Sequence, residues 1–205
     1  MSWVDLSQPV HGGMPVYPGD DPVVISQDKF LSRDHYNHFV SCHGQHVGTH
    51  VDGPMHMTDS PATIDAFPPE QFCGDAVLFD VRGLGEVAVA DIDATRLFPG
   101  CVALFLTGWA LQYGTQAYYA SHPALSPELA DCLVAAGVKL VGVDMPSPDH
   151  VPFPVHRRLL SAGVCIVENL RGLDRLLHKA AIRFYAFPLA IRADSSPVRA
   201  VAEVD

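Results

Sequence analysis

Short apolar runs separated by turn-rich polar segments set the pattern of this chain. The runs at 76–80, 101–106, 139–143 and 164–167 have the length and side chains of buried strands, and Val4 to Ser7 predicts a short opening strand. Two segments rich in glycine, proline or polar residues, 9–22 and 58–71, predict loops.

Helix signals lie between the later strands. Ser126-Pro127-Glu128 combines a capping hydroxyl, a proline at the first helical position and an acid that favours the helix dipole, so it predicts a helix start. Gly137 then predicts the end of that helix. A second helix is predicted over 156–162, ended by Gly163, and we therefore expect a mixed α/β fold.

One stretch departs from this alternation, because it carries ligands where a strand would carry packing residues. Residues 46–56 read His-Val-Gly-Thr-His-Val-Asp-Gly-Pro-Met-His, and the β-branched residues and glycine within them disfavour a helix. In a strand, His46, His50 and Asp52 would share one face and Val47, Thr49 and Val51 the other. Between the histidines, Gly48 would leave room for an ion.

We expect this ligand-bearing strand to be the second of two strands within 37–52, joined near His43-Gly44. Two imidazoles and a carboxylate form a donor set for divalent first-row metals that leaves coordination positions open. His56 follows the Gly53-Pro54 turn and is the candidate acid/base, since free imidazole has a pKa of about 6.5.

The alternative is that these histidines are solvated or hydrogen-bonded residues without a role in chemistry. A single histidine would support that interpretation, but three with an aspartate, in phase on one strand, favour a metal or catalytic site. His35, His38 and His43 are expected to be structural or solvated.

The motif His-x-Gly-Thr-His-x-Asp-x-Pro-x-His resembles the signature of the cyclase family, whose best-known members are bacterial kynurenine formamidases, with isatin hydrolases as more distant relatives. Further matches run along the chain. They are Tyr17 to Asp20, Gly142 to Asp149, His156 to Glu168, Phe187 to Leu189 and Ser196 to Ala200. The resemblance implies a single compact α/β domain over 1–205, with a mixed β-sheet flanked by helices.

The resemblance also implies roles for particular residues. His46, His50 and Asp52 would bind one metal, Asp52 would bridge to a second metal held by His156 and Glu168, and His56 would be the acid/base. Zinc is the first expectation for both ions, although manganese accepts the same donors. Tyr17 would cover the substrate, in a position where kynurenine formamidases typically have tryptophan.

Composition limits the possible partners. At 205 residues the chain is long enough for one domain with a sizeable core, and its net charge of −10 argues against nucleic-acid binding. No apolar run approaches the ~20 residues of a membrane span, and the first residues lack a signal-peptide pattern, so we expect a cytoplasmic protein.

The five cysteines are scattered and odd in number, which predicts reduced core residues rather than disulfides or a thiolate metal site. A cysteine nucleophile at Cys42, beside His43, is a weak alternative because nothing nearby marks its thiol as activated.

The function expected from these features is hydrolysis of a small amide, of the arylformamidase type, by metal-activated water with His56 moving the proton. Within the same class, the alternative is opening of a cyclic amide such as isatin or of a small ester. A metal or small-molecule binding protein without turnover needs the ligands but not His56, and a structural zinc site is usually richer in thiolates. A homo-oligomer, a dimer or larger, is expected from the family.

Overall fold

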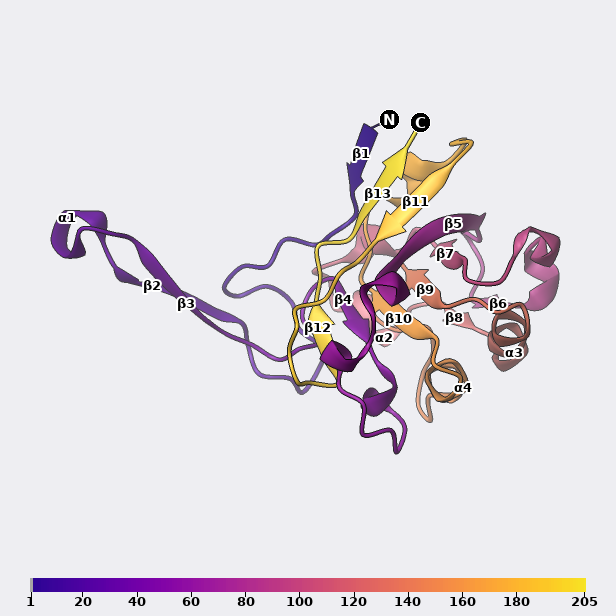
Figure 1. The fold of residues 1–205 in the computed structure, drawn as a ribbon, viewed down its shortest axis with the longest axis horizontal. Coiled ribbons are helices and arrows are strands. Elements are labelled where there is room, and N and C mark those ends of the chain that lie inside the picture. The colour runs from indigo at the N-terminus through magenta and orange to yellow at the C-terminus, as the bar shows by residue number, and fades with distance from the viewer. Residues whose placement is uncertain (1) are drawn as a thin grey trace.

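The computed structural model describes residues 2–205, which fold around one nine-stranded sheet (Figure 1). In spatial order its strands are β1 (Ser2–Asp5), β13 (Val201–Val204), β11 (Ile182–Tyr185), β5 (Cys73–Asp80), β7 (Val102–Leu106), β9 (Leu140–Val143), β10 (Cys165–Glu168), β4 (His50–Asp52) and β12 (Ser195–Pro197). The strands from β5 to β10 pair in parallel and the outer pairs are antiparallel, so the expected mixed sheet is confirmed.

The remaining strands and the α-helices are short. They are β2 (Val24–Lys29), β3 (His38–Cys42), β6 (Glu86–Val87), β8 (Ala124–Leu125), α1 (Leu31–Asp34), α2 (Ala117–Ala120), α3 (Pro127–Ala135) and α4 (Pro154–Ser161). Helices α3 and α4 lie side by side at one side of the sheet (Figure 1). None of the helices within residues 2–205 has the length and hydrophobicity needed to cross a membrane.

Two hydrophobic cores lie on the two faces of the sheet. Along β7, Val102 and Leu104 belong to one core, while Ala103 and Phe105 belong to the core beneath α3 and α4. A strand buried on both faces reads as a continuous apolar run, which explains why the central strands were readable from the sequence. Both faces being covered also gives the strand ends a rigid base.

The helix boundaries follow the predicted signals closely. The Ser126 hydroxyl accepts a hydrogen bond from the Leu129 amide at the start of α3, and Gly137 has a left-handed φ of 74° after its end. Helix α4 begins at Pro154, two residues before the predicted start at His156. The opening strand is shifted to Ser2–Asp5 from the predicted 4–7.

The prediction of one ligand-bearing strand through 46–52 is wrong. Strand β4 contains only His50–Asp52, and Gly48 adopts a left-handed φ of 58° that interrupts an extended backbone. A Cβ at Gly48 would lie 3.2 Å from the Met14 side chain, so a side chain at this position would meet the N-terminal loop. His46 therefore reaches the site from a bend.

The two strands expected within 37–52 are present as β3 and β4, on either side of a segment that includes His43-Gly44, but they do not pair with each other. Strand β3 pairs with β2, which the sequence analysis had not identified, and β4 pairs with β10 and β12 in the main sheet. Strands β2 and β3, with α1 at the tip, form a hairpin that projects far from the sheet (Figure 1). We call residues 24–42 the arm.

All five cysteines are free thiols, as predicted, but only Cys101 and Cys165 are buried. Cys42 is exposed on the arm and Cys73 and Cys132 are half-buried, so the core prediction was wrong for these three residues. The thiols of Cys101 and Cys165 pack in the two hydrophobic cores.

Candidate metal centre

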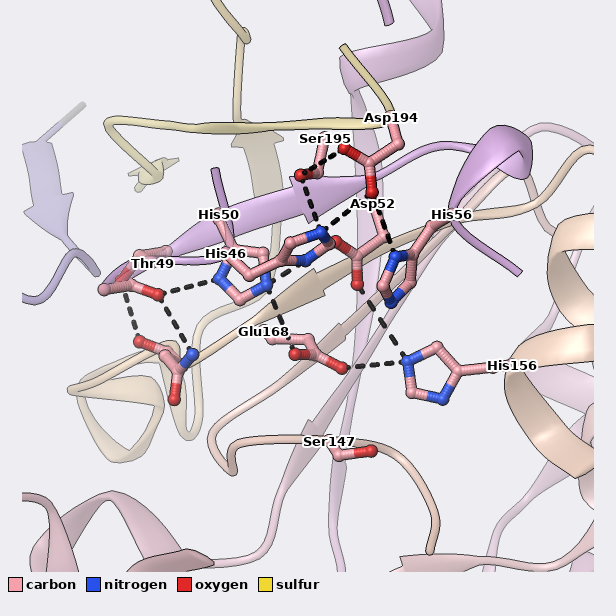
Figure 2. A network of polar contacts seen from close by, with 12 residues as sticks. His46, Thr49, His50, Asp52, His56, Ser147, His156, Glu168, Asp194 and Ser195 are labelled. Atoms are coloured by element: carbon pink, nitrogen blue, oxygen red, sulfur yellow. Dashed lines mark hydrogen bonds and ion pairs between the residues drawn. The ribbon is translucent and has the colours of Figure 1, made fainter. Parts of the chain in front are cut away.

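The candidate metal centre lies where three elements meet at one end of the sheet (Figure 2). His50 and Asp52 come from β4, and Glu168 is the last residue of the neighbouring strand β10, where it is the register partner of His50. His156 projects from α4, and His46 approaches from the bend before β4. The antiparallel pairing of β4 with β10 therefore places donors from distant parts of the sequence side by side.

The donor atoms are in close contact. Glu168 lies between two imidazoles, with Oε2 3.3 Å from His50 Nε2 and Oε1 3.1 Å from His156 Nε2. His46 Nδ1 lies 2.9 Å from Asp52 Oδ1, whose partner oxygen Oδ2 is 3.9 Å from His156 Nε2. All five predicted ligands thus come together around the two carboxylates.

Two groups of three donors lie within 4.8 Å of one another: His50, Asp52 and Glu168 form one, and His46, Asp52 and His56 form the other. This grouping differs from the expected division, in which His46, His50 and Asp52 share one metal. Asp52 belongs to both groups, as expected of a bridging carboxylate, and the candidate acid/base His56 lies among the donors.

The donors fit a cation because the centre contains buried polar atoms without hydrogen-bond partners. Among the described residues, His50 Nε2 and both carboxylate oxygens of Asp52 are buried and make no hydrogen bond. Unsatisfied buried polar atoms are costly, and groups of imidazole and carboxylate donors are those that bind divalent first-row metals. The centre can therefore hold a metal ion.

The electrostatics of the centre favour positive charge. Burial alone would lower the pKa of His46, but the charges of Asp52 and Asp194 raise it to about 11. Burial opposes protonation of His156 in the same way, while Asp149 and Glu168 raise the pKa of that imidazole to about 10. Without a metal, protons on these imidazoles balance the carboxylates, and a bound cation would displace them.

Residues 4–150 match the sequence profile of the family described as "Putative cyclase". The chain belongs to this family. A curated relative, a kynurenine formamidase from Bacillus cytotoxicus, is 30% identical over 207 residues, covering 97% of this chain and 96% of the relative. The cyclase-family membership expected from the sequence motifs is therefore confirmed.

Solved structures agree on the architecture of this cyclase-family chain. Isatin hydrolase A from Ralstonia solanacearum superposes with a TM-score of 0.88 at 23% identity, covering 98% of this chain and 91% of the other, which shows a shared fold. A potential metal-dependent hydrolase with cyclase activity has a TM-score of 0.78 at 25% identity, covering 98% and 96%.

Two hydrogen bonds orient the metal-facing histidines of this cyclase-family chain. The His50 Nδ1 donates to the Gly48 carbonyl oxygen at 2.9 Å, which leaves Nε2 facing the carboxylates. The His156 Nδ1 donates to Asp149 Oδ1 at 2.6 Å, and Asp149 also accepts from two amides in the first turn of α4. Such partners fix the ring and raise the basicity of a metal-binding imidazole.

Asn169 connects the two strands that carry the ligands. It follows Glu168 directly and has a left-handed φ of 57°, a conformation that asparagine tolerates. Its side-chain amide donates to the same Gly48 carbonyl that His50 uses, at 2.9 Å, and its Oδ1 accepts from the Tyr118 hydroxyl at 2.8 Å. Its own carbonyl accepts from the Thr49 hydroxyl at 2.7 Å.

His56 is held by a carboxylate from the C-terminal part of the chain. Asp194 Oδ2 lies 3.0 Å from His56 Nδ1 and 2.9 Å from His46 Nε2 (Figure 2). The two hydrogen bonds and the charges of these histidines hold the pKa of Asp194 well below its usual range. Because Nδ1 donates to Asp194, the Nε2 of neutral His56 carries the free lone pair.

Sequence analysis gave no role to several residues that the structure places here, namely Asp149, Asn169, Asp194 and Ser195. Asp149 ends the segment Gly142 to Asp149 on which the resemblance partly rests, so a signal was present. Asp194 and Ser195, whose hydroxyl lies 3.0 Å from His46 Nε2, precede the C-terminal Ser-Pro segment without any comparable pattern.

A cavity opens over the metal centre, with His46, His50, His56, His156 and Glu168 at its base. We take as its mouth the part lined by the exposed Tyr17 and Asp20 of the N-terminal loop, together with the half-buried Tyr119 of α2 and Phe153, which precedes α4. The rings of Tyr17 and Tyr119 meet edge to face, with centroids 5.7 Å apart. The cavity thus has a polar base and an aromatic mouth.

Proposed function

We propose that this cyclase-family chain is a metal-dependent hydrolase of a small aryl amide, of the arylformamidase type, converting N-formylkynurenine to kynurenine and formate. The observation that carries the proposal is the buried donor cluster at the base of an aromatic cavity, beside the free Nε2 of His56. The curated relatives named kynurenine formamidase support the choice of substrate.

We propose that His46, His50, Asp52, His156 and Glu168 would hold the metal, expected to be two zinc ions, with manganese accepting the same donors. A divalent cation in this donor set supplies Lewis acidity, lowering the pKa of water and stabilising negative charge on a carbonyl oxygen.

His56 carries the proton in this mechanism. Its Nε2 takes a proton from the attacking water and returns it to the amide nitrogen, while Asp194 stabilises the imidazolium through Nδ1. A carbon–oxygen bond forms as the carbon–nitrogen bond breaks, which releases formate and an arylamine. The formyl carbonyl is unhindered and an aniline is a weakly basic leaving group, so both suit this chemistry.

Tyr17 is proposed to contact the aryl ring of the substrate. Its edge-to-face contact with Tyr119 places two aromatic side chains across one side of the cavity mouth. Aromatic rings favour offset or edge-to-face packing against one another, and a bound aryl group would extend this arrangement.

The decisive experiment compares wild-type protein with a His56→Gln variant on N-formylkynurenine, both loaded with zinc or manganese. We expect metal-dependent turnover, reduced about a hundredfold or more in the variant because proton transfer is lost. His11→Gln, at an exposed histidine outside the cavity lining, is the matched control and should behave as wild type. Stoichiometric metal without turnover of N-formylkynurenine or isatin would leave a binding protein or a hydrolase of another amide.

We further propose that the chain forms a homodimer or larger oligomer in which a second copy covers the arm. Large apolar side chains are exposed along it, including Leu31 at 62%, Tyr36 at 53% and Phe39 at 60%. A two-stranded hairpin is only marginally stable alone in water, and a second copy of the same chain is always available to cover these side chains.

We also propose a cytoplasmic location, because a reducing compartment suits the five free thiols.

Sedimentation velocity tests the oligomer. Wild-type protein should sediment as a dimer or larger, and Phe39→Glu should shift it towards the monomer because a charge would enter the interface. Leu111→Glu alters the side chain with 90% exposure outside the arm and should leave the mass unchanged. A monomeric wild-type protein would contradict this part of the proposal.

A further inference from the structure

We propose that Asp20, with Tyr17 and Tyr119, forms a binding site for an ammonium group at the end of the substrate farther from the cleaved bond. The inference rests on the proposed function, because it names the kind of aryl amide that the cavity selects. It concerns the mouth of the cavity, whereas the metal and His56 occupy the base.

A tight turn fixes Asp20 at this mouth. The Asp20 amide donates to the Tyr17 carbonyl at 3.0 Å, and Gly19 between them has a φ of 104°, a conformation suited to glycine. The turn therefore brings the Tyr17 ring and the Asp20 carboxylate to the same side of the cavity, and both line it. Only the backbone of Asp20 is needed for the turn.

The Asp20 carboxylate is available to a ligand. Across residues 2–205, its oxygens form neither a hydrogen bond nor an ion pair, unlike those of Asp28 and Asp34 on the arm. Asp20 lines the same cavity as Tyr17 and Tyr119. Its carboxylate thus shares the cavity wall with the aromatic pair and lacks a partner within the described chain.

The charge at the mouth of the cavity is negative. No lysine or arginine is among the described residues that line the cavity, and Asp20 is the charged side chain of the mouth. A carboxylate binds an ammonium group through a charge-assisted hydrogen bond, and the faces of tyrosine rings attract cations. The same carboxylate disfavours a ligand with a lone anionic group at this position.

This arrangement matches an aryl amide with two distinct ends. The amide would lie at the base, the aryl ring would pack against the tyrosine pair, and an aliphatic amine would reach Asp20. N-formylkynurenine has this layout, since its ketone side chain ends in an amino acid, whereas isatin is compact and uncharged. Asp20 therefore selects the first kind of substrate over the second.

The test uses two substrates that differ in one group: N-formylkynurenine, and its analogue in which hydrogen replaces the α-ammonium group. We expect wild-type protein to prefer the ammonium substrate in kcat/KM, and Asp20→Asn to lower that ratio about fivefold to tenfold, mainly through KM. Raising the salt concentration should lower the ratio for wild type and not for the variant.

Asp21→Asn is the matched control, because Asp21 is the next residue, is exposed and does not line the cavity. A ratio unchanged in Asp20→Asn, or lowered equally in Asp21→Asn, overturns the proposal.

Calorimetric binding of kynurenine and its deaminated analogue gives a readout without turnover. The protein could hydrolyse neither formyl substrate and still bind kynurenine more tightly than the deaminated analogue. If Asp20→Asn then removes that preference, the ammonium site is supported and the proposed hydrolysis is refuted. If the two products bind wild type equally, the ammonium site is refuted whatever the turnover.

Discussion

The base and the mouth of the cavity are built in different ways. Four donors at the base come from β4, β10 and α4, and these residues, His50, Asp52, His156 and Glu168, are all at most 5% exposed. His46 and His56, on either side of β4, are half-buried. At the mouth, Tyr17 and Asp20 belong to an exposed loop between β1 and β2. A metal site needs its donors held within fractions of an ångström, whereas loops accept changes of residue at little cost.

The difference teaches that reaction and substrate choice are separable in this molecule. Changes at the base should alter metal binding and turnover for every substrate, and changes at the mouth should alter discrimination among substrates. The departure from tryptophan to tyrosine at position 17 lies at the mouth, where this division predicts that relatives differ.

The largest effect is expected from Glu168→Gln, which keeps the shape of the side chain and removes its charge between two imidazoles. Metal content after dialysis, measured by atomic emission, should fall, and kcat should drop more than about a thousandfold because several kcal/mol of metal catalysis are lost. Glu86→Gln, at an exposed strand carboxylate, is the control. Full metal content with normal turnover would remove Glu168 from the site.

Asn169→Asp should weaken metal binding about tenfold to a hundredfold, the usual range for partners of metal ligands. A carboxylate oxygen would then face the Gly48 carbonyl, which would repel it and disturb the acceptor of His50. Aspartate tolerates the left-handed backbone, so strain does not confuse the result. Tyr118→Phe removes one hydroxyl of the same network and should have a smaller effect; equal affinities in all three proteins would count against this role.

Metal affinity should rise with pH across the neutral range, by about tenfold per unit for each proton displaced. The pKa values of His46 and His156, raised to about 11 and about 10, mean that both imidazoles hold protons at pH 7 without metal. The gain should end as pH passes these values. Calorimetry in buffers of different ionisation enthalpy would count the protons released; no release at pH 7 would refute the assignment.

The smallest effect is expected at the mouth, where Tyr17→Ala should raise KM about threefold by removing an aromatic contact. Tyr17→Phe keeps the ring and should match wild type. Metal affinity should be unchanged in both variants. A fall in metal affinity on changing Tyr17 would show that base and mouth are not separable.

Much of the base could be predicted because its donors are close in sequence. Four of its six predicted residues lie in the 46–56 stretch, and the caps at Ser126 and Gly137 and the buried central strands follow local rules. Local patterns survive folding where burial is continuous on both faces of a strand.

Features that depend on distant contacts were not predictable. Asp194 is 148 residues from His46, and no local pattern marks a carboxylate that closes a site from that distance. A strand before His43 was expected, but β2 and the arm that it forms with β3 were missed, because neither strand has a buried residue and their sequences show no alternation against a core. The left-handed turn at Gly48 removed the strand periodicity on which the position of His46 had been inferred.

The closing of the site by Asp194 has a consequence for how the chain folds. The parallel strands β5 to β10 and their helices come from one continuous segment, 73–168. In contrast, β12, which follows Asp194, must pair with β4, and β13 must pair with both β1 and β11. Pairings of such long separation form slowly. Because a metal stabilises only the state that binds it, metal binding would stabilise the chain only after these last pairings have formed.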